Sequence, residues 1–336
     1  MAYTGIDDSS SAFQCKTYTG NGSTNNITLD GNSNLQPNWV WIKDTGQSGY
    51  NHNSYDSVRG ATKLLWPNLN NAESTYSNSL TSFNSNGFTL GSDSSNGEAN
   101  GNSNSYVSWN WKESADAGFD IISYTGNGSS GRTISHNLSA VPSMIITKDR
   151  GNSEHWACYH KSLPAGYNIY LNLTNAQDDN NTVYTTTAPT SSVYSVGNNN
   201  RTNGNGRNYI SYVFAGKQGY SNFGSYTGNG STNGTFVYTG FKPAFVLCKL
   251  ISGAGYGWTL FDNKRIGFNE LNYTLQPDGN AAQNTGGGNG RIDILSNGFK
   301  LRTTDAGING SGSTYIFMAF AENPFTTSTG VAGLAR

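Results

Sequence analysis

The stretch Tyr18-Thr-Gly-Asn-Gly-Ser23 (YTGNGS) returns twice, at Tyr124–Ser129 and at Tyr226–Ser231. Asn-Gly pairs favour tight turns, because both residues accept a positive φ. Aromatic and β-branched residues precede the copies, as in Phe119-Asp-Ile-Ile-Ser-Tyr124. We therefore expect each hexapeptide to end a strand and to run into a hairpin turn, with Tyr18, Tyr124 and Tyr226 in one shared structural role.

Two further landmarks keep step with the hexapeptide, whose Tyr residues are 106 and 102 positions apart. One is a proline followed by an apolar run that ends in lysine, which is typical of a strand covered on both faces. The other is an alternating strand that closes each unit. The proline runs are Pro37–Lys43, Pro142–Lys148 and Pro243–Lys249, and the closing strands are Tyr106–Trp111, Tyr209–Phe214 and Tyr315–Phe320.

Three landmarks in constant order predict an all-β protein of three tandem homologous β-sandwich modules of about 100 residues. The expected modules span 10–113, 117–217 and 219–325, followed by a C-terminal tail, 326–336. The period is domain-sized, so we expect each module to fold as its own small domain. The modules have diverged. Asn86-Gly-Phe and Asn297-Gly-Phe precede alternating strands in modules 1 and 3, whereas module 2 has Val193–Gly197 instead.

Composition excludes several classes of function. The net charge is −1, the pI is about 6.4 and lysine and arginine form no cluster, so nucleic-acid binding is not expected. The apolar runs are too short to span a bilayer, and the start of the chain does not resemble a signal peptide, so we expect no membrane insertion. The three cysteines are odd in number, and we interpret them as reduced, small hydrophobic residues.

Few residues suggest catalysis, a metal or a cofactor. His155-Trp-Ala-Cys-Tyr-His160 could suggest a zinc site or a Cys/His pair, but the other modules lack it, and a structural role is favoured. Gly126–Gly131 matches a dinucleotide-binding pattern formally, but no helix follows it. We therefore expect no cofactor and no metal.

The carboxylates are scattered, whereas a glycan-cleaving enzyme needs two of them facing one groove. Asp56, Asp262 and Asp293 stand singly, and we expect no enzymatic activity. Asp56-Ser-Val-Arg59 and Asp262-Asn-Lys-Arg265 occupy one recurrent position. A structural ion pair or a polar cap at a strand end is the preferred interpretation.

Aromatic residues beside Asn and Gly loops suit sugar stacking and protein interfaces equally well. The most divergent loops of this kind supply the candidate surface-contact residues. They are Tyr50, His52 and Tyr55 in module 1, and Tyr256 and Trp258 in module 3. Core packing remains an alternative for Trp258.

Four long stretches are similar to virion structural and tail-fibre-like proteins of marine tailed bacteriophages. They are Met1–Gln14 (MAYTGIDDSSSAFQ), Leu29–Lys43 (LDGNSNLQPNWVWIK), Ser79–Asp93 (SLTSFNSNGFTLGSD) and Thr314–Phe325 (TYIFMAFAENPF). The resemblance covers essentially the whole chain. It implies jelly-roll or concanavalin-like β-modules and a place in the virion, which assembles in the host cytoplasm. It carries no catalytic residues.

The resemblance leads to two structural hypotheses. The first is a tail-fibre or spike component that contributes to attachment to a host-surface glycan, contacts other virion proteins and self-associates, as fibres often do, into a trimer. The alternative is a capsid decoration protein, either a cement protein or a head fibre. A glycan-cleaving enzyme is a third hypothesis, which requires a pair of carboxylates in a cleft. The sequence does not encode the difference between tail and capsid.

Overall fold

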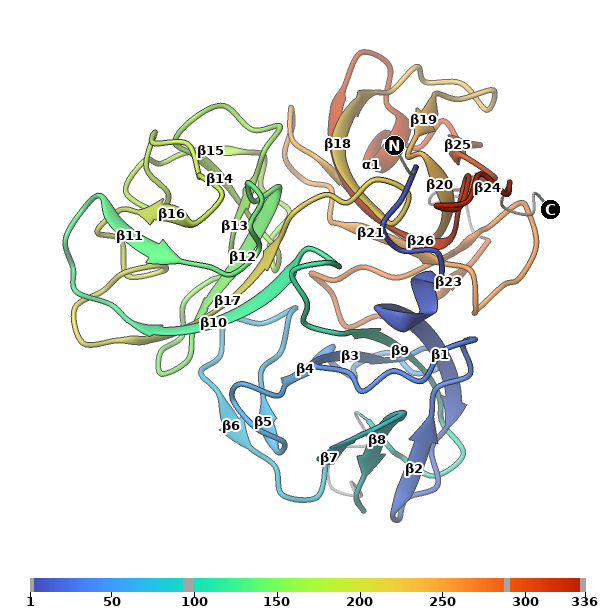
Figure 1. Cartoon of the computed structure of the whole chain (residues 1–336), viewed down its shortest axis with the longest axis horizontal. Coiled ribbons are helices and arrows are strands. Elements are labelled where there is room, and N and C mark those ends of the chain that lie inside the picture. The colour runs from blue at the N-terminus through green and yellow to red at the C-terminus, as the bar shows by residue number, and fades with distance from the viewer. Residues whose placement is uncertain (1–2, 93–98, 287–290, 333–336) are drawn as a thin grey trace.

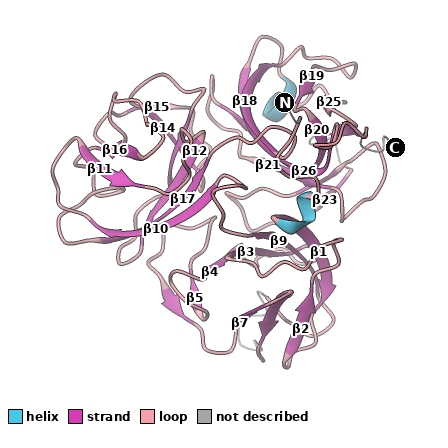
Figure 2. Ribbon diagram, in the orientation of Figure 1, coloured by secondary structure: helices cyan, strands magenta, loops and turns pink. Residues whose placement is uncertain are grey.

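A computed structural model describes residues 3–92, 99–286 and 291–332. Strands make up 42% of the chain and helix 2%, which confirms the predicted all-β sandwich class. Three lobes surround a common centre (Figure 1), and they consist of strands and loops with only short helical turns (Figure 2). We call them repeat 1 (10–113), repeat 2 (117–217) and repeat 3 (219–325); these boundaries stay a prediction.

Each repeat contains a main sheet in which the same four strands follow one another in space. The proline-to-lysine strand lies between the closing strand and a short fourth strand. In repeat 1 the order is β1 (Phe13–Thr19), β9 (Ser105–Trp111), β3 (Trp39–Asp44) and β4 (Asn53–Asp56). In repeat 2 it is β10 (Phe119–Thr125), β17 (Asn208–Phe214), β12 (Met144–Asp149) and β13 (Ala157–His160), extended by β14 (Tyr167–Tyr170) and β15 (Asp178–Asp179). In repeat 3 it is β18 (Ser221–Thr227), β26 (Thr314–Pro324), β20 (Phe241–Leu250) and β21 (Thr259–Asp262).

A smaller cover sheet packs on one face of each main sheet. The cover sheets are β2 (Asn25–Thr28), β8 (Gly87–Leu90) and β7 (Leu80–Asn84) in repeat 1, β11 (Arg132–Ser135) and β16 (Val193–Val196) in repeat 2, and β19 (Phe236–Tyr238), β25 (Gly298–Leu301) and β24 (Ile292–Leu295) in repeat 3. The remaining elements are the short pairs β5 (Lys63–Leu64) with β6 (Ser74–Thr75) and β22 (Tyr273–Thr274) with β23 (Asn284–Thr285), a 3-10 turn at Ser9–Ser11 and the one-turn helix α1 (Ala306–Asn309).

The proline-to-lysine strands are buried on both faces, as the continuous apolar runs predict. In β3, Trp39 and Trp41 point into a core shared by all three repeats, whereas Val40 and Ile42 point toward the cover sheet of repeat 1. Side chains alternate between the two faces of a strand, so one apolar run supplies two cores. β12 and β20 divide their residues in the same way.

The shared core makes one body of the three repeats. It is the largest hydrophobic cluster, and it receives residues from every main sheet. At its centre the Phe320 ring stacks on Phe13 at 5.1 Å and meets Phe214 and Trp111 edge-on at 5.8 and 5.7 Å. Each large side chain buried in this way contributes about 1.5–3 kcal/mol. Solvent therefore does not separate the three modules, in contrast to the small independent domains that the repeat period suggests.

The hexapeptide does not form the hairpin that its Asn-Gly pair predicts. It leaves the main sheet at the end of β1 and enters the cover sheet at β2, and the equivalent strands of the other repeats also lie in different sheets. Its first glycine passes so close to the closing segment that a Cβ on Gly20 would lie 2.1 Å from the Gly101 carbonyl oxygen. Its second glycine, Gly22, has φ +66°. Both glycines are required by a crossing between sheets.

A buried asparagine holds each crossing in place, and sequence reasoning missed it. Asn100, Asn203 and Asn309 are 0% exposed and stand six residues before each closing tyrosine. In repeat 1, Asn100 accepts a hydrogen bond from the Asn21 backbone N–H (3.1 Å) and donates to the Ser23 carbonyl (2.6 Å). The other two repeats have the same pair of bonds. The recurrent Asn-Gly ahead of each closing strand was the available signal.

The hexapeptide tyrosines share one structural role, as expected. Each stacks on the tyrosine that begins the closing strand, and each hydroxyl donates to a nearby carbonyl. The ring centroids lie 5.1 Å apart for Tyr18 and Tyr106, 5.1 Å for Tyr124 and Tyr209, and 5.0 Å for Tyr226 and Tyr315. The acceptors are the carbonyls of Ala99, Thr202 and Ile308. These tyrosines secure the sheet crossing and do not flank a hairpin.

Candidate functional site

The last residue of the fourth strand joins each repeat to the next. In repeat 1 this residue is Asp56, whose Oδ2 lies 2.5 Å from Arg59 Nε within a fully buried ion pair. The same oxygen accepts a hydrogen bond from the hydroxyl of Tyr212 in repeat 2 at 2.7 Å. The predicted structural ion pair is confirmed, and it also holds two repeats together.

The other two junctions use the same position with different chemistry. Asp262 Oδ2 pairs with Arg265 Nε at 2.6 Å and accepts from the indole N–H of Trp109 at 3.2 Å. In repeat 2 the position is held by His160, whose Nε2 bonds to the Phe317 carbonyl of repeat 3 at 3.2 Å. Burial lowers the pKa of His160 to about 4, so the ring is neutral and donates one N–H. The His160 signal is therefore structural, as expected.

A second set of contacts comes from the residue just before the fourth strand. Its ring nitrogen bonds to a backbone carbonyl of the neighbouring repeat. The bonds join His52 to Gln276 (3.1 Å), Trp156 to Trp66 (3.0 Å) and Trp258 to Tyr170 (2.9 Å). His52 is 0% and Trp258 is 1% exposed, so the prediction that they are surface contacts is wrong. Each instead anchors a junction between two repeats.

Backbone bonds form a third set at equivalent positions. The carbonyl that follows each proline-to-lysine strand accepts a hydrogen bond from the neighbouring repeat. The pairs are Thr45 with Gln283 (2.9 Å), Arg150 with Glu73 (2.7 Å) and Ile251 with Gln177 (3.2 Å). Repeat 1 thus contacts repeat 3, repeat 2 contacts repeat 1 and repeat 3 contacts repeat 2. The chain closes into a ring with quasi-threefold symmetry.

The other three predicted contact residues lie in different environments. Tyr55 is 0% exposed and its hydroxyl bonds to Ser79 Oγ inside repeat 1, so this prediction is also wrong. Tyr50 is half-buried. Tyr256 is 41% exposed and lines a cavity of about 300 Å³ together with Asp305. The wrong predictions have two causes. His52 bonds to a carbonyl of another repeat, 224 positions away, whereas Tyr55 packs in the core of its own repeat.

The quasi-symmetry breaks in the loop after the fourth strand of repeat 3. Leu65 follows Asp56 by nine residues and Ile169 follows His160 by nine, but Leu275 follows Asp262 by thirteen. Phe268, in this longer loop, is 71% exposed, the largest exposed fraction among the large hydrophobic side chains of the described residues. A single exposed ring is ordinary, but this one lies with Ile266 and Leu271 along one groove.

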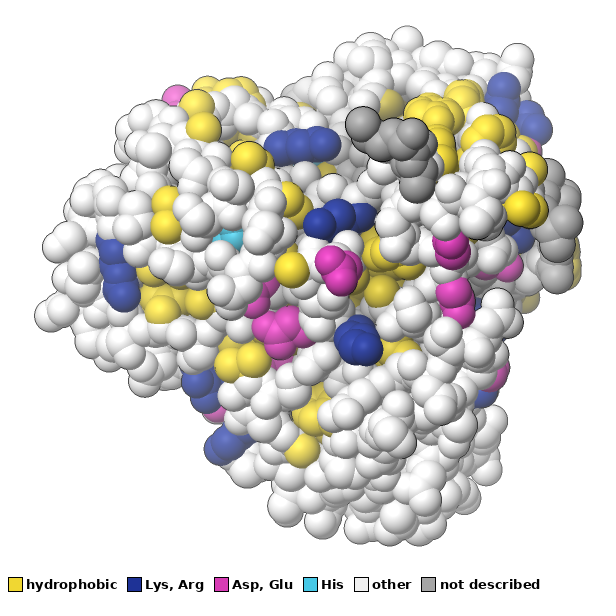
Figure 3. All heavy atoms as spheres, viewed as in Figure 1, with side chains coloured by type: hydrophobic (Ala, Val, Ile, Leu, Met, Phe, Trp, Pro, Cys, Tyr) yellow, Lys and Arg dark blue, Asp and Glu magenta, His cyan; other side chains and the backbone are white. Residues whose placement is uncertain are grey.

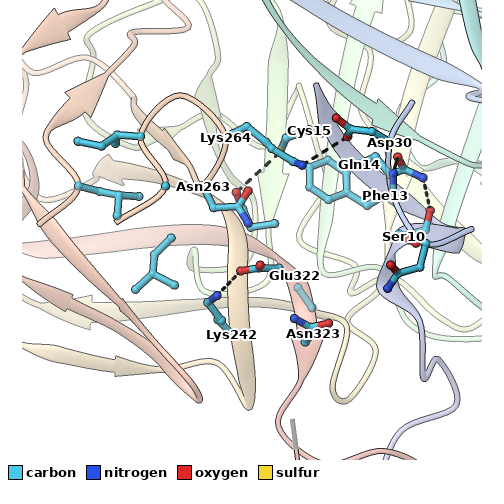
Figure 4. Close-up of a pocket in the computed structure, with 18 of the residues that line it drawn as sticks. Ser10, Phe13, Gln14, Cys15, Asp30, Lys242, Asn263, Lys264, Glu322 and Asn323 are labelled. Atoms are coloured by element: carbon cyan, nitrogen blue, oxygen red, sulfur yellow. Dashed lines mark hydrogen bonds and ion pairs between the residues drawn. The ribbon is translucent and has the colours of Figure 1, made fainter. Parts of the chain in front are cut away.

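This longer loop borders a groove of about 670 Å³ between repeats 1 and 3. The volume lies in the usual range for ligand sites. Side chains of both repeats point toward the same space (Figure 4). The apolar lining consists of Phe13, Cys15, Ala244, Ile266, Phe268, Leu271, Ile294 and Ala321. Amide side chains line the rest, from Gln14, Asn32, Asn263, Asn269 and Asn323.

The charged residues of the groove are paired with one another. Lys242 Nζ lies 2.5 Å from Glu322, and Lys264 Nζ lies 3.4 Å from Asp30, so the second pair bridges the two repeats. Both pairs are drawn in Figure 4. Over the centre of the molecule, acidic, basic and hydrophobic side chains lie close together (Figure 3). The groove thus combines apolar and amide side chains with charges that nearly cancel.

Cys15, in the groove floor, is not activated. Burial raises the pKa of its thiol well above the ordinary value, as it also does for Cys158 and Cys248. All three cysteines are buried and free, which agrees with the interpretation as small hydrophobic residues.

Within 3–92, 99–286 and 291–332, no group of three or more His, Cys, Asp or Glu side chains has the arrangement of a metal site. No helix in the same ranges has the length and hydropathy needed to cross a bilayer.

The fold and its junctions define an all-β protein whose three repeats share one core and leave a groove where the first and last repeats meet. Residues 8–324 match the family model described as a domain of unknown function (DUF7483), and the chain belongs to this family. No curated protein and no solved structure matched the chain. The matched range covers all three repeats, so a single family domain contains the whole ring.

Proposed function

We propose that the protein is a non-enzymatic structural component of a bacteriophage virion, placed on a tail fibre or spike, where it contributes to attachment to a host-surface glycan. The observation that supports this most is the closed ring of equivalent contacts. One chain presents three similar lobes around an axis, which suits a partner with threefold symmetry. The resemblance of the sequence to virion proteins supplies the biological setting.

The ring also bears on self-association. The sequence suggests a homotrimer by analogy with fibres, but this single chain already provides a threefold arrangement. A monomer seated on the axis of a trimeric partner satisfies the same geometry. Several weak contacts, one from each lobe, would then add through effective concentration.

Immunogold electron microscopy tests the proposal. Antibodies against the purified protein are applied to particles of the phage whose genome encodes it. We expect gold at the tail. Gold on the head would replace the tail assignment with the capsid decoration alternative, and the absence of gold on both intact and opened particles would overturn a virion role.

A second assay tests the non-enzymatic part. The purified protein is incubated with host polysaccharide, and released reducing ends are measured. We expect none. Release that disappears when one carboxylate is changed to its amide would establish a glycan-cleaving enzyme.

A further inference from the structure

The groove between repeats 1 and 3 lies at the junction that no linker crosses. Residues 114–116 join the expected repeats 1 and 2, and residue 218 joins repeats 2 and 3, whereas repeat 3 meets repeat 1 only through non-covalent contacts. The N-terminal segment reinforces this junction, since the Tyr3 hydroxyl donates to the Gly240 carbonyl at 2.7 Å and the Ser328 N–H to Asp7 at 2.6 Å. A ligand in the groove would contact both ends of the ring.

The charged groups of the groove have partners already. Glu322 holds Lys242, and Asp30 holds Lys264 and also Lys16, at 3.0 Å. The remaining acid, Asp8, accepts hydrogen bonds from the hydroxyls of Ser10 and Ser33, both at 2.6 Å. An anionic ligand would have to displace Glu322 or Asp30 from a lysine, and a cationic ligand would have to compete with the hydroxyls that already bond to Asp8.

Neutral polar groups remain available. The side chains of Asn32 and Asn323 line the groove, and their amides can both donate to and accept from a bound molecule. The exposed ring of Phe268 offers an apolar platform beside them.

We infer that this groove binds a neutral saccharide, with one sugar face packed on Phe268 and hydroxyls bonding to the side-chain amides of Asn32 and Asn323. Sugars combine many hydroxyls with apolar ring faces, and the groove combines amides with an aromatic ring. A lipid chain would leave the amides unsatisfied. This inference rests on the proposed attachment role and gives it a ligand class and a location.

Three variants test the inference. Phe268→Ala and Asn323→Ala alter the groove, and Val58→Ala is the matched control, because Val58 is an exposed residue (43%) in the shorter loop of repeat 1. Binding of short neutral oligosaccharides to the full chain is measured by glycan array and by saturation-transfer NMR. The melting temperature of each variant establishes that it folds.

We expect the unaltered protein and the Val58→Ala variant to bind neutral oligosaccharides equally. Phe268→Ala should weaken binding about tenfold, since an aromatic contact is worth roughly 0.5–1.5 kcal/mol. Bound sugar should also raise the melting temperature, because it stabilises the closed ring.

Several results would overturn the inference: no neutral saccharide binds, Phe268→Ala binds as tightly as the unaltered protein, or binding is confined to acidic sugars or to peptides. Gold-labelled virions together with an empty glycan array would refute the saccharide site and leave the virion role standing. Saccharide binding through Phe268 without any virion labelling would refute the virion role and retain the site.

Discussion

The loops that follow the fourth strand in repeats 1 and 3 begin alike and end differently. Both start with an aspartate at the strand end and an arginine three residues later, and both make a buried ion pair. In repeat 1 the Arg59 guanidinium continues to Glu73 at 3.3 Å and the loop returns at once to the sheet. In repeat 3 four extra residues follow, and Nη1 of Arg265 has no partner.

This difference separates residues that stabilise the fold from residues that line the groove. The contacts that close the ring occur in every repeat, because three similar modules share one core only if their edges match. The groove occurs where the repeated pattern is interrupted, and its exposed Phe268 contributes little to the core. Stability should therefore depend on the repeated positions and binding on the interruption.

The largest effect is expected from breaking the repeated ion pair. Asp56→Ala removes the nearer of the two carboxylates that pair with the buried Arg59, and it also removes the acceptor of Tyr212. Such losses cost about 3–5 kcal/mol. Asp262→Ala should behave in the same way in repeat 3. Urea unfolding measures both changes.

Asp293→Ala provides the matched control, because its pair with Arg302 is partly exposed and lies within one repeat. Such pairs contribute about 0–1 kcal/mol. If Asp56→Ala cost no more than Asp293→Ala, the buried pair would not be what holds the repeats together.

The next largest loss of stability is expected from changes in the hexapeptide of repeat 3. Tyr226→Ala removes a buried ring that stacks on Tyr315, which should cost about 3 kcal/mol. Tyr226→Phe keeps the ring and loses only the bond to the Ile308 carbonyl, at about 1 kcal/mol. Equal losses in the two variants would assign the role of this residue to the hydroxyl and not to the stacking.

A smaller change in stability should accompany a change in pH. Burial lowers the pKa of Lys148 and of Lys249 from 10.5 to about 8. Between pH 8 and 10 these two lysines bind more protons in the unfolded chain than in the folded chain, which makes the free energy of unfolding rise with pH. The three buried cysteine thiols oppose this rise, because burial raises their pKa above the ordinary 9.0 and they lose protons over this range only in the unfolded chain. Above pH 10 the free energy of unfolding should fall, because burial also raises the pKa of tyrosines such as Tyr212 above the ordinary 10.0.

Lys249→Met checks the contribution of the lysines, since it removes one of the two. Compared with the unaltered protein, the free energy of unfolding of this variant should rise less, or fall more, between pH 8 and 10. An identical pH dependence in the two proteins would mean that Lys249 does not contribute.

The smallest effect on stability is expected from shortening the long loop. Deleting Gly267–Glu270 gives repeat 3 the spacing of repeat 1. The deletion removes the exposed Phe268 and the bonds between Asn269 and Ile294, so the cost should be about 1 kcal/mol. Saccharide binding should disappear. A severe loss of stability would show that the loop belongs to the fold, and the contrast between the two loops would fail.

Features of the fold that depend on local sequence pattern could be predicted. The period of YTGNGS and the apolar run Trp39–Ile42 predict the repeats and a strand buried on both faces, and the recurrent Asp56 and Asp262 predict the ion pairs. Burial that depends on another repeat could not be predicted. His52 and Trp258 stand in polar loops, and only the ring brings the carbonyls of Gln276 and Tyr170 to them.

Two errors have identifiable signals. The hairpin prediction relied on the Asn-Gly pair alone. A positive φ is also required where a chain crosses from one sheet to another, so the pair does not distinguish the two. The groove was missed because its signal is a difference in spacing, thirteen residues after Asp262 against nine after Asp56. Comparing the spacings of the repeats directly would have marked this loop.

The central claim is that the three repeats form one cooperative unit through their shared core. Differential scanning calorimetry tests it most directly, by comparing the van't Hoff enthalpy of unfolding with the calorimetric enthalpy. One cooperative unit predicts a ratio of about 1, with a single transition. A ratio of about one third, or three separable transitions, would show that the modules unfold independently and would contradict the claim.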